Sequence, residues 1–132
     1  MNDVLDFWFG APGSAEHGTA RREWFVKDAA FDALIAQRFG ARVEAALAGQ
    51  SGALPQTAEG MLGRIVVLDQ FTRNMFRDTP RAFAGDAQAL ALARRLLETG
   101  MDHALAPLQR WFAYLPFEHS EDAADQIGRA HV

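Results

Sequence analysis

The sequence predicts an all-α protein that folds as one helical domain. Apolar residues recur at helical spacing, residues typical of helix starts and stops separate these stretches, and no segment alternates in the manner of a strand. The 132 residues are one domain's length, and 49% of them are hydrophobic, which suffices for a core and argues against disorder. We therefore expect an antiparallel array of helices joined by short links.

Three helices are expected in the first half of the chain. A dense apolar stretch over residues 4–9 ends at Gly10 and predicts a short helix. Asp28 can cap a long helix whose apolar residues recur at helical spacing, namely Phe31, Leu34, Ile35, Phe39, Val43, Ala46 and Leu47. After a loop, Thr57 can cap a third helix, and the β-branched run at residues 65–68 fits a buried helix better than a strand.

The second half begins with two alternative helix starts. Thr79 followed by Pro80 is typical of a helix N-terminus, although Asp86 can instead open the main helix expected over residues 87–99. Gly100 then supplies the stop.

A later helix begins at Pro107, and Pro116 is expected to end or bend it. Its aromatic residues are expected in the core or lining a groove, where a buried tyrosine hydroxyl must find a partner; they are Trp111, Phe112 and Tyr114. Residues 118–126 can start another helix.

Composition and charge exclude several classes of function. The net charge is −4 and no basic block is present, so we expect no nucleic-acid partner. The absence of cysteine removes disulfides and thiolate metal sites. No apolar run is long enough for a membrane span and no signal peptide is recognisable, so we expect a cytoplasmic protein without a membrane partner.

A first polar string, residues 69–74, interrupts core-forming sequence. Asp69 and Arg73 stand four residues apart, so on a helix they share a face and can form an ion pair. Such a pair can be purely structural, or it can orient Asn74 and hold a carboxylate or phosphate ligand through the planar guanidinium group. Gln70 lies within the same string as a further ligand-binding candidate.

A second polar string runs from Glu118 to Asp122 and contains His119. Capping at a helix start explains this string most simply, because the Ser120 hydroxyl can accept hydrogen bonds from backbone N–H groups and acidic side chains are stabilising near a helix N-terminus. Binding of a polar ligand, and acid–base catalysis or metal binding by His119, are the alternatives. Neighbouring positions cannot form a local Ser–His–Asp triad, and we expect no metal and no cofactor.

The remaining polar candidates lie outside these strings. Arg81 is either part of a helix N-terminus or an anchor for an anion. His17 and His103 are expected to be ordinary surface histidines.

These motifs, taken in order, resemble a bacterial family known as domain of unknown function 924, whose members are similar to tetratricopeptide-type helical proteins. The resemblance covers nearly all of residues 1–126 and implies an α-solenoid-like fold without implying a reaction. The matching strings are residues 4–10, 24–25, 31–32, 68–74, 79–84 and 114–122.

The chain departs from the family pattern at two places. Thr72 stands where the family usually has proline, so the turn after Phe71 is expected to be looser. Residues 127–132 look like a translated sequencing adapter, so we expect a non-native tail after Gln126 and a domain, residues 1–126, that lacks its last helices. Missing helices would leave Trp111, Phe112 and their neighbours facing water.

Two hypotheses for function follow. The first is a binding module for a small anionic ligand or peptide, with a groove formed by Gln70, Arg73, Asn74, Arg81, Tyr114 and His119. The second is a hydrolase-like enzyme that uses His119 as acid–base and Asp69 or Glu118 as orienter. Convergence of these side chains in one pocket would favour catalysis, whereas separate faces would favour capping roles.

Overall fold

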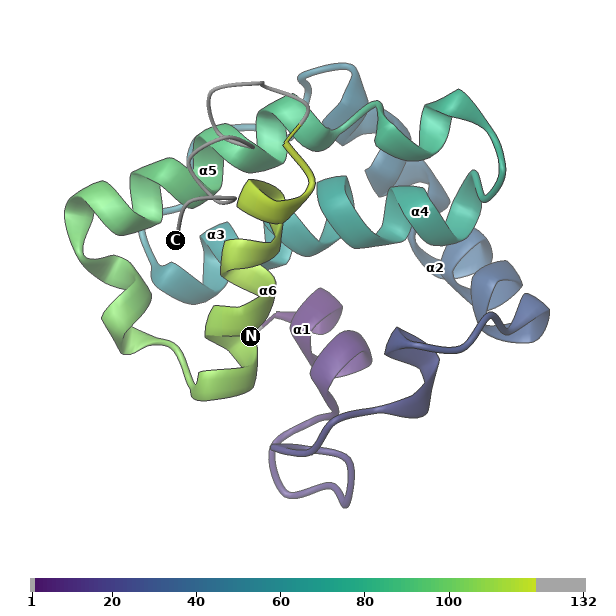
Figure 1. Ribbon diagram of the computed structural model, residues 1–132, viewed down its shortest axis with the longest axis horizontal. Coiled ribbons are helices and arrows are strands. Elements are labelled where there is room, and N and C mark those ends of the chain that lie inside the picture. The colour runs from purple at the N-terminus through teal and green to yellow at the C-terminus, as the bar shows by residue number, and fades with distance from the viewer. Residues whose placement is uncertain (1, 121–132) are drawn as a thin grey trace.

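The computed structural model describes residues 2–120, and these residues form helices and loops without a strand. The α-helices of the described residues are α1 Asp3–Phe9, α2 Ala29–Leu47, α3 Ala58–Ile65, α4 Thr72–Met75, α5 Asp86–Thr99 and α6 Pro107–Glu118 (Figure 1). A π-helix, Val66–Phe71, joins α3 to α4. Single-turn 3₁₀-helices lie at Arg22–Trp24, Pro80–Phe83 and Met101–Ala104. The all-α prediction is confirmed, whereas a tetratricopeptide-like order of the helices stays a prediction.

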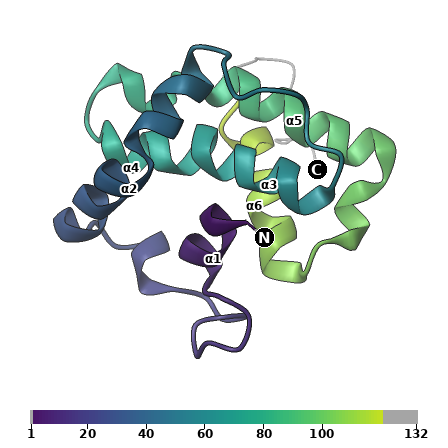
Figure 2. The ribbon, with the colours of Figure 1, turned by 180° about the vertical axis from the view of Figure 1, so that it is seen from behind.

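The continuous rod formed by α3, the π-helix and α4 crosses the middle of the molecule (Figures 1 and 2). Helix α1 contacts α3 and the π-helix, α2 contacts the π-helix and α4, and α5 and α6 contact α3. The rod is therefore buried on nearly all sides, and its fully buried side chains include Met61, Leu62, Ile65, Val66, Leu68 and Phe71. Such burial explains the uninterrupted apolar run at residues 65–68, where α3 passes into the π-helix.

Local capping rules account for most helix boundaries. The Asp28 carboxylate accepts hydrogen bonds from the backbone N–H groups of Ala30 and Phe31, and the Thr57 hydroxyl accepts one from Gly60. Gly100 ends α5 with a left-handed φ of 74°. The predicted starts of α2 and α3 and the predicted end of α5 are confirmed.

Several local expectations are wrong. Leu34 is 39% exposed, because it lies away from the buried stripe of α2. Pro80 opens only a 3₁₀ turn, and the main helix begins at Asp86, the alternative start. No loose turn follows Phe71, because Thr72 is fully buried and continues the helix.

The end of α6 also differs from expectation. Pro116 lies inside the helix, which continues to Glu118, and His119 is its C-cap rather than part of a helix start. The expected helix beyond Ser120 and the expected non-native tail at residues 127–132 lie outside the described residues.

An aromatic cluster joins α1, the loop before α2, and α6. Phe112 is only 2% exposed and packs edge-on against the ring of Trp24, at a centroid distance of 4.8 Å. Trp111 is 39% exposed and stacks on Phe25, which is 62% exposed. Phe112 is therefore a core residue, whereas Trp111 lies partly at the surface. The absence of further helices after Gln126 stays a prediction.

Candidate functional site

The π-helix carries the candidate site. Its wider turn is frequent at functional positions, and here it contains Asp69, whose side chain is completely buried. The Thr72 hydroxyl donates a hydrogen bond of 2.9 Å to the Leu68 carbonyl oxygen at the junction with α4. A charged carboxylate in the interior needs partners, because burial without them costs several kcal/mol.

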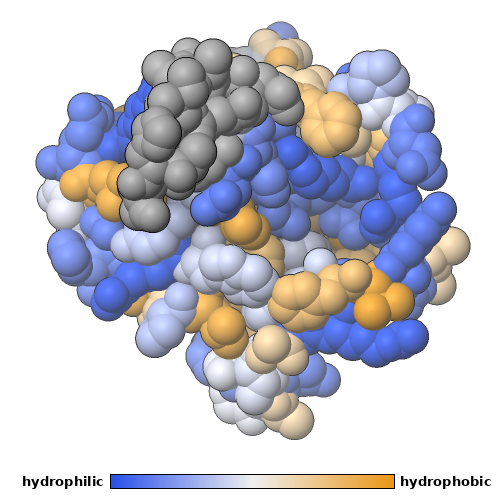
Figure 3. Space-filling model, viewed as in Figure 1, coloured by the Kyte–Doolittle hydropathy of each residue, from blue (hydrophilic) through white to orange (hydrophobic). Residues whose placement is uncertain are grey.

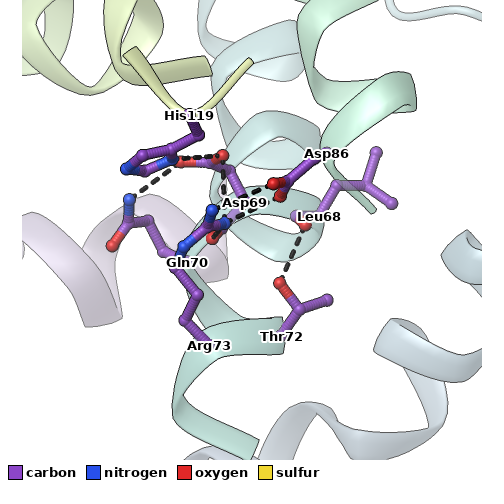
Figure 4. A network of polar contacts seen from close by, with 7 residues as sticks. All are labelled: Leu68, Asp69, Gln70, Thr72, Arg73, Asp86 and His119. Carbon is purple, nitrogen blue, oxygen red and sulfur yellow. Dashed lines mark hydrogen bonds and ion pairs between the residues drawn. The ribbon is translucent and has the colours of Figure 1, made fainter. Parts of the chain in front are cut away.

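Asp69 has three such partners, which Figure 4 shows around its carboxylate. Gln70 Nε2 donates to Oδ2 at 2.9 Å, His119 Nδ1 contacts Oδ1 at 2.9 Å, and Arg73 Nη1 lies 3.3 Å from Oδ1. Arg73 Nη1 also donates to the Asp69 carbonyl oxygen at 2.6 Å. The two polar strings of the sequence therefore meet in space, although they lie about fifty residues apart.

Asp86, the first residue of α5, completes the network on the other side of Arg73. The guanidinium group donates to both of its carboxylate oxygens, from Nη1 at 2.8 Å and from Nη2 at 3.0 Å. This two-point contact fixes the plane of the guanidinium group. The network therefore connects the π-helix, α4, α5 and the end of α6.

The contact with Asp69 orients the His119 ring. Asp69 faces Arg73 and acts as an acceptor, so Nδ1 of His119 donates the hydrogen atom and Nε2 of the neutral ring carries the lone pair. Figure 4 shows Nε2 on the side of the ring away from Asp69. Within residues 2–120 the structure records no partner for Nε2, and the side chain is 25% exposed. This arrangement can hold a base or a hydrogen-bond acceptor at the surface.

Two other candidate residues, Arg81 and Tyr114, have partners elsewhere. Arg81 pairs with Glu44 of α2, and its guanidinium carbon lies 4.4 Å from the centre of the Phe76 ring. The Tyr114 hydroxyl donates to Asp102 Oδ2 at 2.7 Å, which supplies the partner expected for a buried tyrosine.

Glu118 is an exposed residue at the end of α6, next to His119. Full convergence of the predicted residues in one pocket is therefore not found.

A polar depression of about 170 Å³ lies beside the network and contains Gln70, Arg73 and Asn74 in its wall. The sequence interpretation missed the other lining residues, which are Trp8, Glu23, Trp24, Phe25, Val26, Lys27 and Arg77. On the face seen in Figure 3, hydrophilic residues lie directly beside hydrophobic ones. No local pattern connects residues 23–27 to residues 70–77, so only the fold reveals that they share a site.

Asp32 of α2 organises one side of this depression. It accepts hydrogen bonds from Asn74 Nδ2 at 2.7 Å and from Arg77, whose Nε and Nη2 lie 2.9 and 3.1 Å from its two oxygens. The hydrogen bond with Asp32 raises the pKa of Arg77, so this guanidinium group stays charged. Within residues 2–120 the structure records no partner for Nη1 of Arg77. The amine of Lys27, whose side chain is 65% exposed, lies 3.7 Å from Oδ2 of Asp78.

Residues 2–120 contain no group of three or more histidine, cysteine, aspartate or glutamate side chains placed to hold a metal ion. None of the described helices has the length and apolar character needed to cross a membrane.

Fold and site together define an all-α protein with a buried ion-pair network around a π-helix. The chain belongs to the family described as bacterial proteins of unknown function, DUF924, whose model matches residues 4–131. It is also similar to a solved structure from Agrobacterium tumefaciens, itself described as a protein of unknown function, with 38% sequence identity and a TM-score of 0.81. That match covers 95% of this chain and 66% of the other chain. No curated protein matches the sequence.

Proposed function

We propose that this protein is a binding module whose polar depression accepts a small ligand with an anionic group, such as a phosphate or carboxylate. The observation that supports this proposal is the convergence of Lys27, Arg73 and Arg77, from two segments far apart in the sequence, on one depression. Gln70 and Asn74 add amide groups to the same wall, and Trp24 and Phe25 offer apolar surface for the rest of the ligand.

The two arginines present fixed donors rather than a large positive charge. Arg73 is held by Asp69 and Asp86, and Arg77 is held by Asp32. These contacts leave Nε of Arg73 and Nη1 of Arg77 for a ligand, in orientations that need no further ordering. Lys27 is the only lysine in the chain, and its exposed ion pair with Asp78, at 3.7 Å, can be exchanged for a ligand anion. We therefore expect selectivity from geometry and only modest affinity.

The single lysine permits a direct test. Reductive methylation with ¹³C labels Lys27 and the N-terminal amine, which serves as an internal reference in ¹H–¹³C spectra. Titration with inorganic phosphate and with phenyl phosphate is expected to shift the Lys27 signal in a saturable manner while the reference signal stays still. Equal movement of both signals would indicate ionic screening and would refute the proposal.

Two matched variants test whether the arginines of the depression contribute to phosphate binding. Arg77→Gln should weaken phenyl phosphate binding by about tenfold, the effect of losing a charge-assisted hydrogen bond worth about 1.4 kcal/mol. Arg95→Gln removes an exposed arginine of α5 that lies outside the depression, and it should leave binding unchanged. An equal loss in both variants would mean that only net charge matters.

A second proposal, a hydrolase-like enzyme, rests on the 2.9 Å contact between Asp69 and His119. In this proposal Asp69 is the orienter, and Nε2 of His119 takes a proton from an attacking water molecule. Hydrolysis of p-nitrophenyl acetate and p-nitrophenyl phosphate by the wild type should then be abolished in His119→Gln and strongly reduced in Asp69→Asn. Activity that survives His119→Gln would eliminate this second proposal and leave the binding module. Cytoplasmic location stays a prediction from the sequence.

A further inference from the structure

We infer that the protein has a second ligand site, separate from the polar depression, that binds an organic cation with an apolar body. The site is a cavity of about 560 Å³ between α1, the loop that follows it and the start of α3. This volume lies within the range typical of small-molecule sites, and none of the lining residues belongs to the depression around Arg73.

The apolar part of the wall comes from Leu5 and Phe9 of α1 and from Pro12 in the following loop. Leu5 and Phe9 are themselves well buried, with 6% and 4% exposure, so their positions are fixed by the core. A rigid apolar wall of this kind can bury the hydrocarbon part of a ligand, which is favourable in proportion to the apolar area removed from water. A bare metal ion would gain nothing from it, whereas an organic ligand would.

The charged part of the wall is exclusively negative. Asp6 and Glu59 lie in it, and none of the lining residues is a lysine or an arginine. Within the described part of the chain no cation pairs with either carboxylate, although other acids such as Asp3 and Asp32 have an arginine partner. Two carboxylates without a counter-charge favour a ligand that brings a positive charge and N–H donors.

His17 adds a further acceptor to the same wall. Its Nδ1 lies 2.9 Å from the Gly10 carbonyl oxygen, which can only accept, so Nδ1 carries the hydrogen atom. Nε2 of the neutral ring is then an acceptor. Gly10 holds this loop with a left-handed φ of 87°, and a Cβ atom there would lie 2.9 Å from the backbone nitrogen of His17. The acceptor is thus positioned by the loop itself, and the cavity matches a primary ammonium or amidinium group attached to a hydrophobic body.

The test compares two probes of similar shape and opposite charge, 2-phenylethylammonium and 3-phenylpropanoate, by ¹⁵N-resolved NMR titration of the whole chain near pH 7.5. The ammonium probe is expected to give saturable shifts in α1, in residues 10–17 and at the start of α3, and the carboxylate probe is expected to give none there. Equal binding of both probes, shifts centred elsewhere, or no saturable shift up to about 20 mM would overturn the inference.

Charge-neutralising variants then test whether the two carboxylates of the cavity bind the cation. The double substitution Asp6→Asn with Glu59→Gln should weaken binding of 2-phenylethylammonium by at least about tenfold. Glu98→Gln removes an exposed acid of α5 outside the cavity and should change the affinity by less than about twofold. If the double variant does not fold by circular dichroism, each single substitution should still weaken binding about threefold. Unchanged affinity in the charge-neutralised variants would overturn the inference.

Discussion

Gly85 lies against the π-helix, and we predict that Gly85→Ala destabilises the protein. A Cβ atom at this position would overlap the carbonyl oxygen of Leu68 and would lie 3.0 Å from its carbonyl carbon and 3.1 Å from its Cα. These are backbone atoms of the central rod and cannot rotate away as a flexible side chain can. The φ of Gly85 is −95°, so glycine is required here for space and not for a left-handed conformation.

The magnitude follows from two opposing effects. Overpacking that forces a backbone shift costs about 1–3 kcal/mol, and replacing glycine by alanine returns about 0.5–1 kcal/mol through the unfolded chain. The midpoints of these ranges give a net loss of about 1.2 kcal/mol, which corresponds to a fall in Tm of about 4 °C for a domain of this size. The shift would also move Asp86, the next residue, away from Arg73 and so break the two-point ion pair.

Urea unfolding followed by tryptophan fluorescence measures this effect, with Gly40→Ala as the matched control. Gly40 lies inside α2, and a Cβ atom there would meet only Met75 Cε, at an ordinary contact distance of 3.7 Å. The control should therefore gain about 0.5–1 kcal/mol from helix propensity. If Gly85→Ala were as stable as the control, the close packing of α5 on the π-helix would be refuted.

Two further predictions concern single side chains. Tyr114 is the only tyrosine, and its hydrogen bond to Asp102, together with burial, raises its pKa above 10.0. An ultraviolet titration should show this raised pKa, and the pKa should return toward 10 in Asp102→Asn. Since the pKa is raised in the folded state, this hydrogen bond stabilises the protein below pH 10, and its contribution is lost as the pH rises through the folded-state pKa. Asp69→Asn should lower the free energy of unfolding, measured with urea, by about 2–3 kcal/mol, because Gln70 and the other donors then face a neutral amide. The loss is limited because Asp86 still pairs with Arg73, and a loss under about 0.5 kcal/mol would contradict the network.

The helices could be predicted from the sequence because their causes are local. The Asp28 and Thr57 caps lie within three residues of the N–H groups that they satisfy, and Gly100 ends α5 through its own backbone conformation. The π-helix could not be predicted, because its apolar residues fit an ordinary buried helix equally well. Its position depends on contacts with α1, α2 and α5, which no local window contains.

About half of the candidate site could likewise be predicted from residues that are close in the sequence. The pairing of Asp69 with Arg73 follows from their separation by four residues on one helix. The contribution of Asp86 depends on how α5 packs, and Arg81, which is near in sequence, turns instead to Glu44 of α2. The sequence therefore indicates which residues are candidates, whereas packing decides which of them share a network.

The position of His119 could not be predicted from the sequence, because tertiary contacts overrode the local preference of proline to end a helix. Proline usually ends a helix because it lacks an N–H group and crowds the preceding turn, yet α6 continues beyond Pro116. The last turn is closed by the His119 backbone N–H, which donates to the Leu115 carbonyl oxygen at 3.0 Å, and the His119 ring is held by Asp69 of the π-helix. Had α6 ended at Pro116, the ring would lie on an unconstrained segment and the two polar strings would not meet. The contact that orients the His119 ring is therefore also one that holds the end of α6 against the central rod.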